Sequence, residues 1–225
     1  MSKVILVRHA QASLGKANYD ELSQRGFKQA ELLGNYFSQY YQKPSTIISG
    51  TLKRHEQTAQ ALVKAYPQAL TYQQDADWNE FDFKKLIHLY LKQRPNETPS
   101  TGDVRAFFSI LKKSMLAWSQ DELDGTSDKL ENWDEFSARI NRAFTRVMKC
   151  ESEGPQIIVS SGGSIAIKLM QILEISPKTM INLNFQIRNT SFSELLIKKH
   201  NIDLVTFNQV NHLLENNNDS MITYA

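Results

Sequence analysis

The chain has 225 residues, 41% of them hydrophobic and 22% charged, so it can bury a core as one large domain or two small ones. Its formal net charge of +2 is too small for nucleic acid or an anionic membrane to be the main partner. Cys150 is the single cysteine, which excludes an intrachain disulfide and a cysteine-built metal site. No run approaches the roughly 20 apolar residues of a membrane span. The apolar run 4–7 is too short for a signal peptide, so we expect a cytoplasmic protein.

Strand-like and helix-like segments alternate from the start of the chain. Residues 3–7 (KVILV) and 45–50 (STIISG) are short apolar runs, typical of buried parallel strands. Each is followed by a helical pattern. The first helix is expected over 22–41, with Ser23 as its cap and an apolar stripe that includes Phe27; the second is expected over 51–66.

The middle of the chain, from about 78 to 147, has few strand signals. Helical patterns occur at 84–93, 103–119 and 132–149, separated by polar loops. We interpret this section as a helical insertion or lid on an α/β core rather than as an independent domain. Residues 78–130 are expected to shape substrate specificity.

The last third returns to the earlier alternation. Residues 156–160 (QIIVS) read as a third buried strand, and Gly162 and Gly163 open a helix over 164–173. Two alternating segments, 191–198 and 203–208, predict an antiparallel hairpin. The sequence therefore predicts one α/β domain over 1–225, with a mainly parallel central sheet between layers of helices.

Three loops follow the predicted parallel strands, at 8–13, 49–54 and 160–164, and ligands bind beyond the carboxyl ends of such strands. Two of the loops bring an arginine, Arg8 or Arg54, and the first also brings His9. Arginine binds phosphate oxygens in a bidentate manner, and an imidazole can attack phosphorus. We therefore expect a phosphoryl group at this edge of the sheet. The further candidates for substrate binding are Gln11, Ser13, Ser161 and Gly162.

These loops resemble the motifs of the histidine phosphatase (phosphoglycerate mutase-like) superfamily. The family has Arg-His-Gly after its first strand, where this chain has Arg8, His9 and Ala10. Further segments match later motifs in the same order, so the resemblance covers essentially the whole chain: LSQRG (22–26), SGTLKRHEQTAQAL (49–62), WNEFDF (78–83), IVSSGGSIA (158–166) and NHLL (211–214).

The resemblance implies a three-layer phosphoglycerate mutase-like fold and a phosphatase that hydrolyses a phosphomonoester. His9 would carry the phosphoryl group as phosphohistidine, while Arg8 and Arg54 hold its oxygens. Glu80 would protonate the leaving oxygen, with Asp77 and Asp82 as the alternative acids. No metal or other cofactor is implied, and the partner is a small phosphorylated substrate. The sequence does not determine the oligomeric state.

The chain departs from the family at two positions. Where the last motif reads Ser-His-Gly-Gly, with the histidine completing the phosphate pocket, this chain has Ser161. A hydroxyl can bond a phosphate oxygen but carries no charge, and losing one such donor costs about 10²–10³ in turnover. We therefore expect a weakened enzyme; the alternative is a degenerate member that binds a phosphorylated ligand or partner without useful catalysis. The change to Ala10 is mild where φ is negative.

Two other enzymes are less consistent with the sequence. A serine hydrolase would need a Gly-x-Ser-x-Gly elbow, which SSGGS (160–164) does not provide. A phosphoglycerate mutase is disfavoured as well, because the family's mutases have a Tyr-Gly stretch after the acid, and none follows Glu80 here. Of the remaining histidines, His55 and His88 are expected on the surface. His212 is expected to make a structural hydrogen bond, with substitution for the missing pocket histidine as the alternative.

Overall fold

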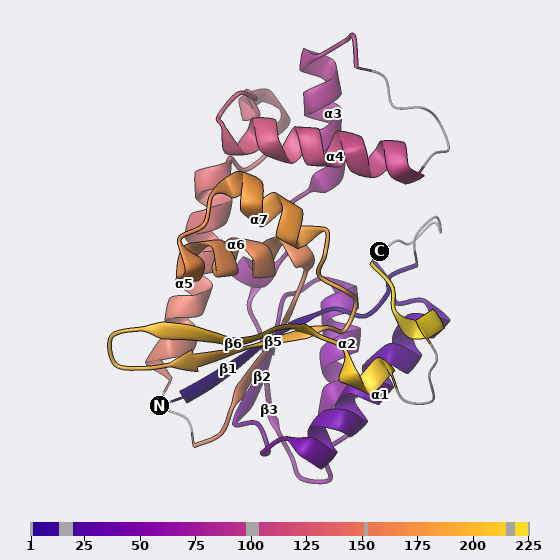
Figure 1. The fold of residues 1–225 in the computed structure, drawn as a ribbon, viewed down its shortest axis with the longest axis vertical. Coiled ribbons are helices and arrows are strands. Elements are labelled where there is room, and N and C mark those ends of the chain that lie inside the picture. The colour runs from indigo at the N-terminus through magenta and orange to yellow at the C-terminus, as the bar shows by residue number, and fades with distance from the viewer. Residues whose placement is uncertain (1, 14–19, 98–103, 151–152, 215–218, 225) are drawn as a thin grey trace.

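The computed structural model describes residues 2–13, 20–97, 104–150, 153–214 and 219–224, and a six-stranded sheet forms its middle (Figure 1). The strands lie in the order β3-β2-β4-β1-β5-β6. The first four are mutually parallel, and β5 and β6 form the predicted antiparallel hairpin at one edge. The strands are β1 (Ser2–Arg8), β2 (Thr46–Ser49), β3 (Thr71–Gln74), β4 (Gln156–Ser160), β5 (Phe192–Ile197) and β6 (Ile202–Gln209). The predicted α/β fold with a mainly parallel sheet is confirmed.

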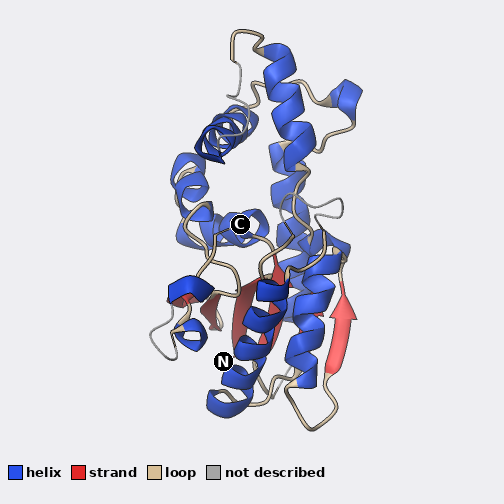
Figure 2. Cartoon of the chain, turned by 90° about the vertical axis from the view of Figure 1, so that its right-hand side faces the viewer, coloured by secondary structure: helices blue, strands red, loops and turns tan. Residues whose placement is uncertain are grey.

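Helices cover both faces of the sheet and extend well beyond one end of it. Figure 2 shows the strands confined to the lower half of the molecule, while the upper half is helical. None of the helices in the described part of the chain is long and apolar enough to cross a membrane. The helices are α1 (Gln24–Tyr40), α2 (Lys53–Lys64), α3 (Phe83–Gln93), α4 (Val104–Ser119), α5 (Trp133–Lys149), α6 (Gly162–Leu173) and α7 (Pro177–Asn184).

Successive side chains of β1 point to opposite faces of the sheet and belong to two separate core clusters. Ile5 and Val7 point to one face, where they meet a cluster that includes Leu33 and Phe37 of α1 and Leu62 of α2. The intervening strand residues point to the other face. Each face of the strand is therefore apolar, as expected of a parallel strand buried on both sides.

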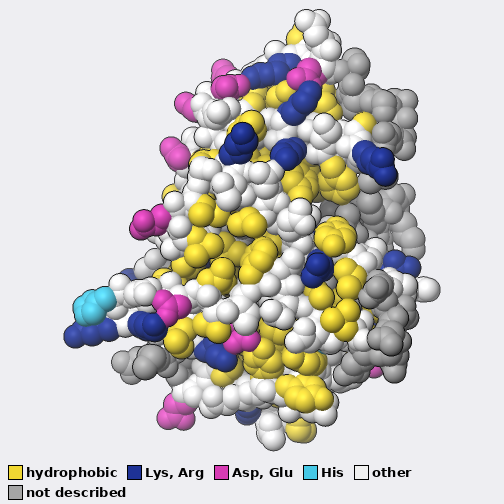
Figure 3. Space-filling model, in the orientation of Figure 1, with side chains coloured by type: hydrophobic (Ala, Val, Ile, Leu, Met, Phe, Trp, Pro, Cys, Tyr) yellow, Lys and Arg dark blue, Asp and Glu magenta, His cyan; other side chains and the backbone are white. Residues whose placement is uncertain are grey.

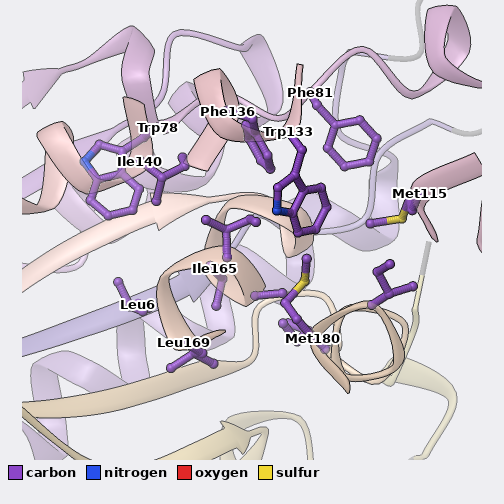
Figure 4. Close-up of a cluster of buried hydrophobic side chains, with 14 of the residues drawn as sticks. Leu6, Trp78, Phe81, Met115, Trp133, Phe136, Ile140, Ile165, Leu169 and Met180 are labelled. Atoms are coloured by element: carbon purple, nitrogen blue, oxygen red, sulfur yellow. The ribbon is translucent and has the colours of Figure 1, made fainter. Parts of the chain in front are cut away.

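The second core layer joins the sheet to the helical insertion (Figure 4). Leu6 of β1 and Ile165 of α6 belong to the same buried cluster as Trp78, Phe136 of α5 and Met115 of α4. Trp78 and Phe136 are almost completely buried. The predicted insertion helices thus share one hydrophobic cluster with the sheet.

Three local features differ from the prediction. Phe27 is 49% exposed, because the buried stripe of α1 runs through Gly26, Ala30 and Leu33 instead. The edge strand β3 was missed, since its residues TYQQ are polar and largely exposed. Helix α7 was also missed, although Ser176 caps it and Pro177 stands at its first position. Residue 103 of the predicted helix 103–119 lies outside the described residues.

Candidate active site

Arg8 and His9 stand at the carboxyl end of β1, and backbone hydrogen bonds fix their positions. The N–H of His9 donates to the carbonyl of Ser160 in β4 at 2.8 Å, and the side-chain amide of Asn189 donates to the carbonyl of His9 at 3.1 Å. The guanidinium of Arg8 donates to the carbonyl of Ile187. Because the backbone is held on both sides, the direction of the His9 side chain is determined by the sheet.

The two ring nitrogens of His9 have different partners, which assigns its tautomer. His9 is 4% exposed, and its Nδ1 lies 2.7 Å from the carbonyl of Ala10, which can only accept, so Nδ1 carries the proton. Nε2 accepts from Nε–H of Arg54 at 3.2 Å and therefore holds the lone pair. Burial lowers the pKa of His9 well below its usual range, and nearby Arg54, His55 and Arg8 lower it further. This neutral form is the one that can act as a nucleophile.

Arg54 occupies the first turn of α2, where Asp20 holds it. Its NH1 lies 2.6 Å from one carboxylate oxygen of Asp20, and the other oxygen accepts from the backbone N–H of Lys53 at 2.9 Å. Thr58 links this turn to the histidine loop, since its hydroxyl donates to the Arg54 carbonyl at 2.7 Å and accepts from the N–H of Ala10 at 3.1 Å. Asp20 was not among the predicted site residues, because nothing local marks a loop carboxylate that pairs with a distant arginine.

Glu80 is half-buried and lies against the N-terminus of α6. Its carboxylate accepts from the N–H groups of Gly163 at 2.9 Å and of Phe81 at 3.2 Å. Burial raises the pKa of Glu80, while these N–H groups and the charges of Arg54 and Arg139 partly oppose the rise. The approach requires glycine, since a Cβ at position 163 would stand 2.3 Å from Glu80 Oε1.

The segment before Glu80 is held in place by α5 and α6. Arg139 donates to the carbonyls of Asp77 at 2.9 Å and Asn79 at 2.6 Å, and the hydroxyl of Ser164 donates to the same Asn79 carbonyl at 2.9 Å. These bonds fix the backbone that leads into Glu80, which lines the same cavity as His9.

The two alternative acids have other partners. Asp77 pairs with Arg146 at 2.7 Å, and Asp82 caps α3 by accepting from the N–H of Lys85 at 3.0 Å. Of the three carboxylates that the sequence left open, only Glu80 lines the cavity described below.

Ser161 and His55 form a buried pair beside Arg54. The hydroxyl of Ser161 lies 2.6 Å from Nε2 of His55 and 3.5 Å from NH2 of Arg54. The prediction of a surface position for His55 is wrong, because it is 0% exposed in the first turn of α2, where it faces the end of β4. Burial and the charge of Arg54 lower the pKa of His55 well below its usual range.

His88 and His212 lie where they were predicted. His88 is exposed on α3. His212 is buried and its Nε2 lies 3.0 Å from the Thr190 hydroxyl, so it makes the expected structural hydrogen bond and does not line the cavity. Burial lowers the pKa of His212 to about 3.

Two predicted substrate-binding residues are not brought into the cavity lining. The side-chain oxygen of Gln11 accepts from the hydroxyl of Ser23 at 2.9 Å, and Ser13 is buried, with its N–H donating to the carbonyl of Glu21 at 2.8 Å. Ala10 is not among the residues of positive φ in the described chain, so its substitution for glycine causes no backbone strain.

One cavity of about 830 Å³ collects the remaining predicted residues. Its polar lining contains Arg8, His9, Arg54, Glu80, Ser161 and Gly162. An aromatic wall comes from the insertion and from the segment after α7, namely Phe83, Phe107, Phe108 and Phe185, with Arg105 and Lys112 beside it. On the face shown in Figure 3, Lys and Arg side chains spread over α3 and α4, and hydrophobic side chains gather below them. The cavity therefore combines an anion site with an apolar wall.

Comparisons with known proteins bear on the family and on the fold. The family model of the histidine phosphatase superfamily (branch 1) matches residues 4–210. A mutant phosphoserine phosphatase from Entamoeba histolytica, solved with phosphoserine, is 21% identical, with 95% of this chain and 100% of that chain covered and a TM-score of 0.67. A mycobacterial glucosyl-3-phosphoglycerate phosphatase is 20% identical, with coverage of 92% and 99% and a TM-score of 0.66. A putative alpha-ribazole-5'-P phosphatase from Escherichia coli is 17% identical, with coverage of 93% and 98% and a TM-score of 0.63. No curated protein gives a significant match.

Proposed function

Because this chain belongs to the histidine phosphatase superfamily, we propose that it hydrolyses a phosphomonoester through a phosphohistidine intermediate at His9. The observation that carries the proposal is the state of His9, a buried neutral imidazole whose lone-pair nitrogen contacts Arg54. Arg8 and Glu80 line the same cavity. A nucleophile, two guanidinium groups and an acid are the parts that phosphoryl transfer needs.

In the first half-reaction, the phosphoryl oxygens replace His9 as the acceptor of the Arg54 Nε–H. Nε2 of His9 then attacks phosphorus, the Nε2–P bond forms and the ester P–O bond breaks. Glu80 gives its proton to the leaving oxygen, and the raised pKa of this carboxyl group supports a protonated starting state. Arg8 and Arg54 offset the charge on the phosphoryl oxygens.

In the second half-reaction, water replaces the alcohol. Glu80, now a carboxylate, takes a proton from the water as it attacks phosphorus. The Nε2–P bond breaks, orthophosphate leaves, and His9 and Glu80 return to their starting states. Atoms and protons balance without a further cofactor.

The apolar wall favours a substrate whose organic part is apolar or aromatic. Phe107 and Phe108 of α4 face the cavity together with Phe83 and Phe185. Aromatic side chains of this kind stack on rings and cover aliphatic groups. Arg105 and Lys112 add positive charge to the same wall, which accommodates a second anionic group on the substrate.

We expect Ser161 to lower kcat. The alternative function is that of a protein that binds a phosphorylated ligand or partner without hydrolysing it. The retention of a neutral His9 and of an acid with a raised pKa supports the enzyme, since a binding protein needs neither group.

Orthophosphate release over a panel of phosphomonoesters tests the proposal. The panel contains phosphoserine, 3-phosphoglycerate, phenyl phosphate and 1-naphthyl phosphate, and the variants are His9→Ala and, as the matched control, the exposed His88→Ala. We expect the two aryl esters to be the better substrates, His9→Ala to lose turnover, and His88→Ala to match the parent.

An acid-labile, base-stable phosphoenzyme should accumulate on rapid quenching. Turnover that survives His9→Ala contradicts the mechanism, and phosphate binding without any turnover supports the binding protein.

A further inference from the structure

Ser161, which stands where the family has a histidine, contacts a second buried imidazole, that of His55. His55 is 0% exposed in the first turn of α2, and Ser161 is 1% exposed at the start of α6. Within the described part of the chain, this 2.6 Å contact is the only hydrogen bond of the His55 ring. The mechanism above gives His55 no role, and burying an imidazole is unfavourable unless its polar atoms are used.

The tautomer of His55 follows from the surroundings of Nδ1. Nδ1 is buried and has no hydrogen-bond partner among the described residues. A proton on Nδ1 would therefore be a buried donor without an acceptor, which native structures avoid more strictly than an unused acceptor. The proton belongs on Nε2, so Nε2–H donates to the oxygen of Ser161.

The hydrogen bonds of Ser161 then leave one direction for its own proton. A serine hydroxyl has one donor and two acceptor positions. His55 Nε2–H occupies one acceptor position, and NH2 of Arg54, at 3.5 Å, faces the other. The Ser161 side chain makes no capping bond to α6, and Ser161 lines the cavity. Its hydroxyl proton is thus available to an acceptor inside the cavity.

Gly50 provides the space that His55 occupies. A Cβ at position 50 would lie 2.3 Å from Nδ1 and 3.0 Å from Cε1 of His55. Any side chain at position 50 would push the ring out of the position in which Nε2 reaches Ser161. The position of the pair therefore depends on two segments, the one from Gly50 to His55 after β2 and the one at Ser161 after β4.

We propose that His55 is a positioning residue of the phosphate site, which donates from Nε2 to Ser161 and thereby directs the Ser161 hydroxyl proton at a phosphoryl oxygen. The inference rests on the proposed function, because it assumes that the phosphoryl group binds beside His9 and Arg54. Burial and Arg54 keep the pKa of His55 low, so the pair supplies direction without positive charge.

Affinity for inorganic phosphate, measured by titration calorimetry, tests the inference without requiring turnover. Ser161→Ala and His55→Leu should each weaken phosphate binding about tenfold, the effect of one hydrogen bond to a charged acceptor. His55→Gln should stay within about twofold of the parent, because its amide N–H reaches the same oxygen; the exposed His88→Gln is the matched control. His55→Asn, whose amide is too short to reach Ser161, should behave like His55→Leu.

The double variant separates positioning from a structural role. His55→Leu combined with Ser161→Ala should bind phosphate no more weakly than either single variant, because both changes remove the same bond. Losses that multiply, or unchanged affinity in both His55→Leu and His55→Asn, would overturn the inference. An acid-stable phosphoenzyme on Ser161 would also overturn it, since His55 would then be a base for a serine nucleophile. A parent that binds phosphate but does not turn over any ester refutes the proposed enzyme and leaves the test of His55 intact.

Discussion

A histidine restored at position 161 is expected to impair the protein on its own and to improve it only when His55 is removed. In the rotamer of Ser161, the first ring atom of the new imidazole would take the place of Oγ, 2.6 Å from His55 Nε2. Non-bonded carbon and nitrogen atoms prefer about 3.5 Å or more. His55 and Arg54 are both buried, so neither can move away without disturbing the core. Ser161→His therefore overpacks the site.

The magnitude follows from overpacking and from the donor that is gained. Extra atoms in a packed interior cost about 1–3 kcal/mol of unfolding free energy, which lowers Tm by about 2–12 °C for a chain of this size. In the double variant His55→Ala with Ser161→His, the new ring can use the vacated space. A cationic donor then replaces the neutral hydroxyl of Ser161. We expect kcat to rise about 10- to 100-fold over the parent. This is less than the full effect of one donor, because the Ser161 hydroxyl of the parent already supplies a hydrogen bond.

The assay compares the parent, each single variant and the double variant by thermal unfolding and by orthophosphate release from the best ester of the panel. We expect Ser161→His and His55→Ala to be slower than the parent and the double variant to be faster. A rise in kcat for Ser161→His alone, with Tm unchanged, would show that an imidazole fits at position 161 beside His55 and would refute the overpacking. A double variant no faster than His55→Ala would show that charge at position 161 does not limit turnover.

Three further changes test two residues of the site and one buried structural histidine. Burial raises the pKa of Glu80 in the fold above its unfolded value, so this carboxyl group lowers the free energy of unfolding at about pH 7; Glu80→Gln should therefore raise Tm at that pH while lowering kcat about 10²–10⁴-fold. The loss in kcat should be smaller for p-nitrophenyl phosphate, whose leaving group needs no proton. Asp20→Asn weakens the hold on Arg54 and should lower kcat/KM about tenfold with little change in Tm. The pKa of His212 is about 3 in the fold and 6.5 in the unfolded chain. Below about pH 6.5 the unfolded chain therefore binds a proton that the folded chain does not bind, and the free energy of unfolding falls as the pH drops from 6.5 toward 3. His212→Gln should therefore lose about 2 kcal/mol less unfolding free energy than the parent between about pH 7 and pH 5, as measured by urea titration.

The sequence by itself determined the layers of the fold and the edge at which the site lies. Buried parallel strands are short apolar runs whose limits are visible locally, so β1, β2 and β4 were predicted to within about a residue at each end. The carboxyl ends of parallel strands meet at one edge of a sheet, which brought Arg8, His9 and Arg54 together before any distance was known. The motif order then identified the family.

The tertiary structure alone decided which polar residues serve the site. His55 looks like a surface residue because a polar side chain in the first turn of a helix has no local mark of burial, and its partner Ser161 lies 106 positions along the chain. Asp20 pairs with Arg54 across 34 positions of sequence. The choice of Glu80 over Asp77 depends on hydrogen bonds from α5 and α6. Hydrogen bonds of this kind depend on angles and distances between segments, and those are set by the packing of the core rather than by any local pattern.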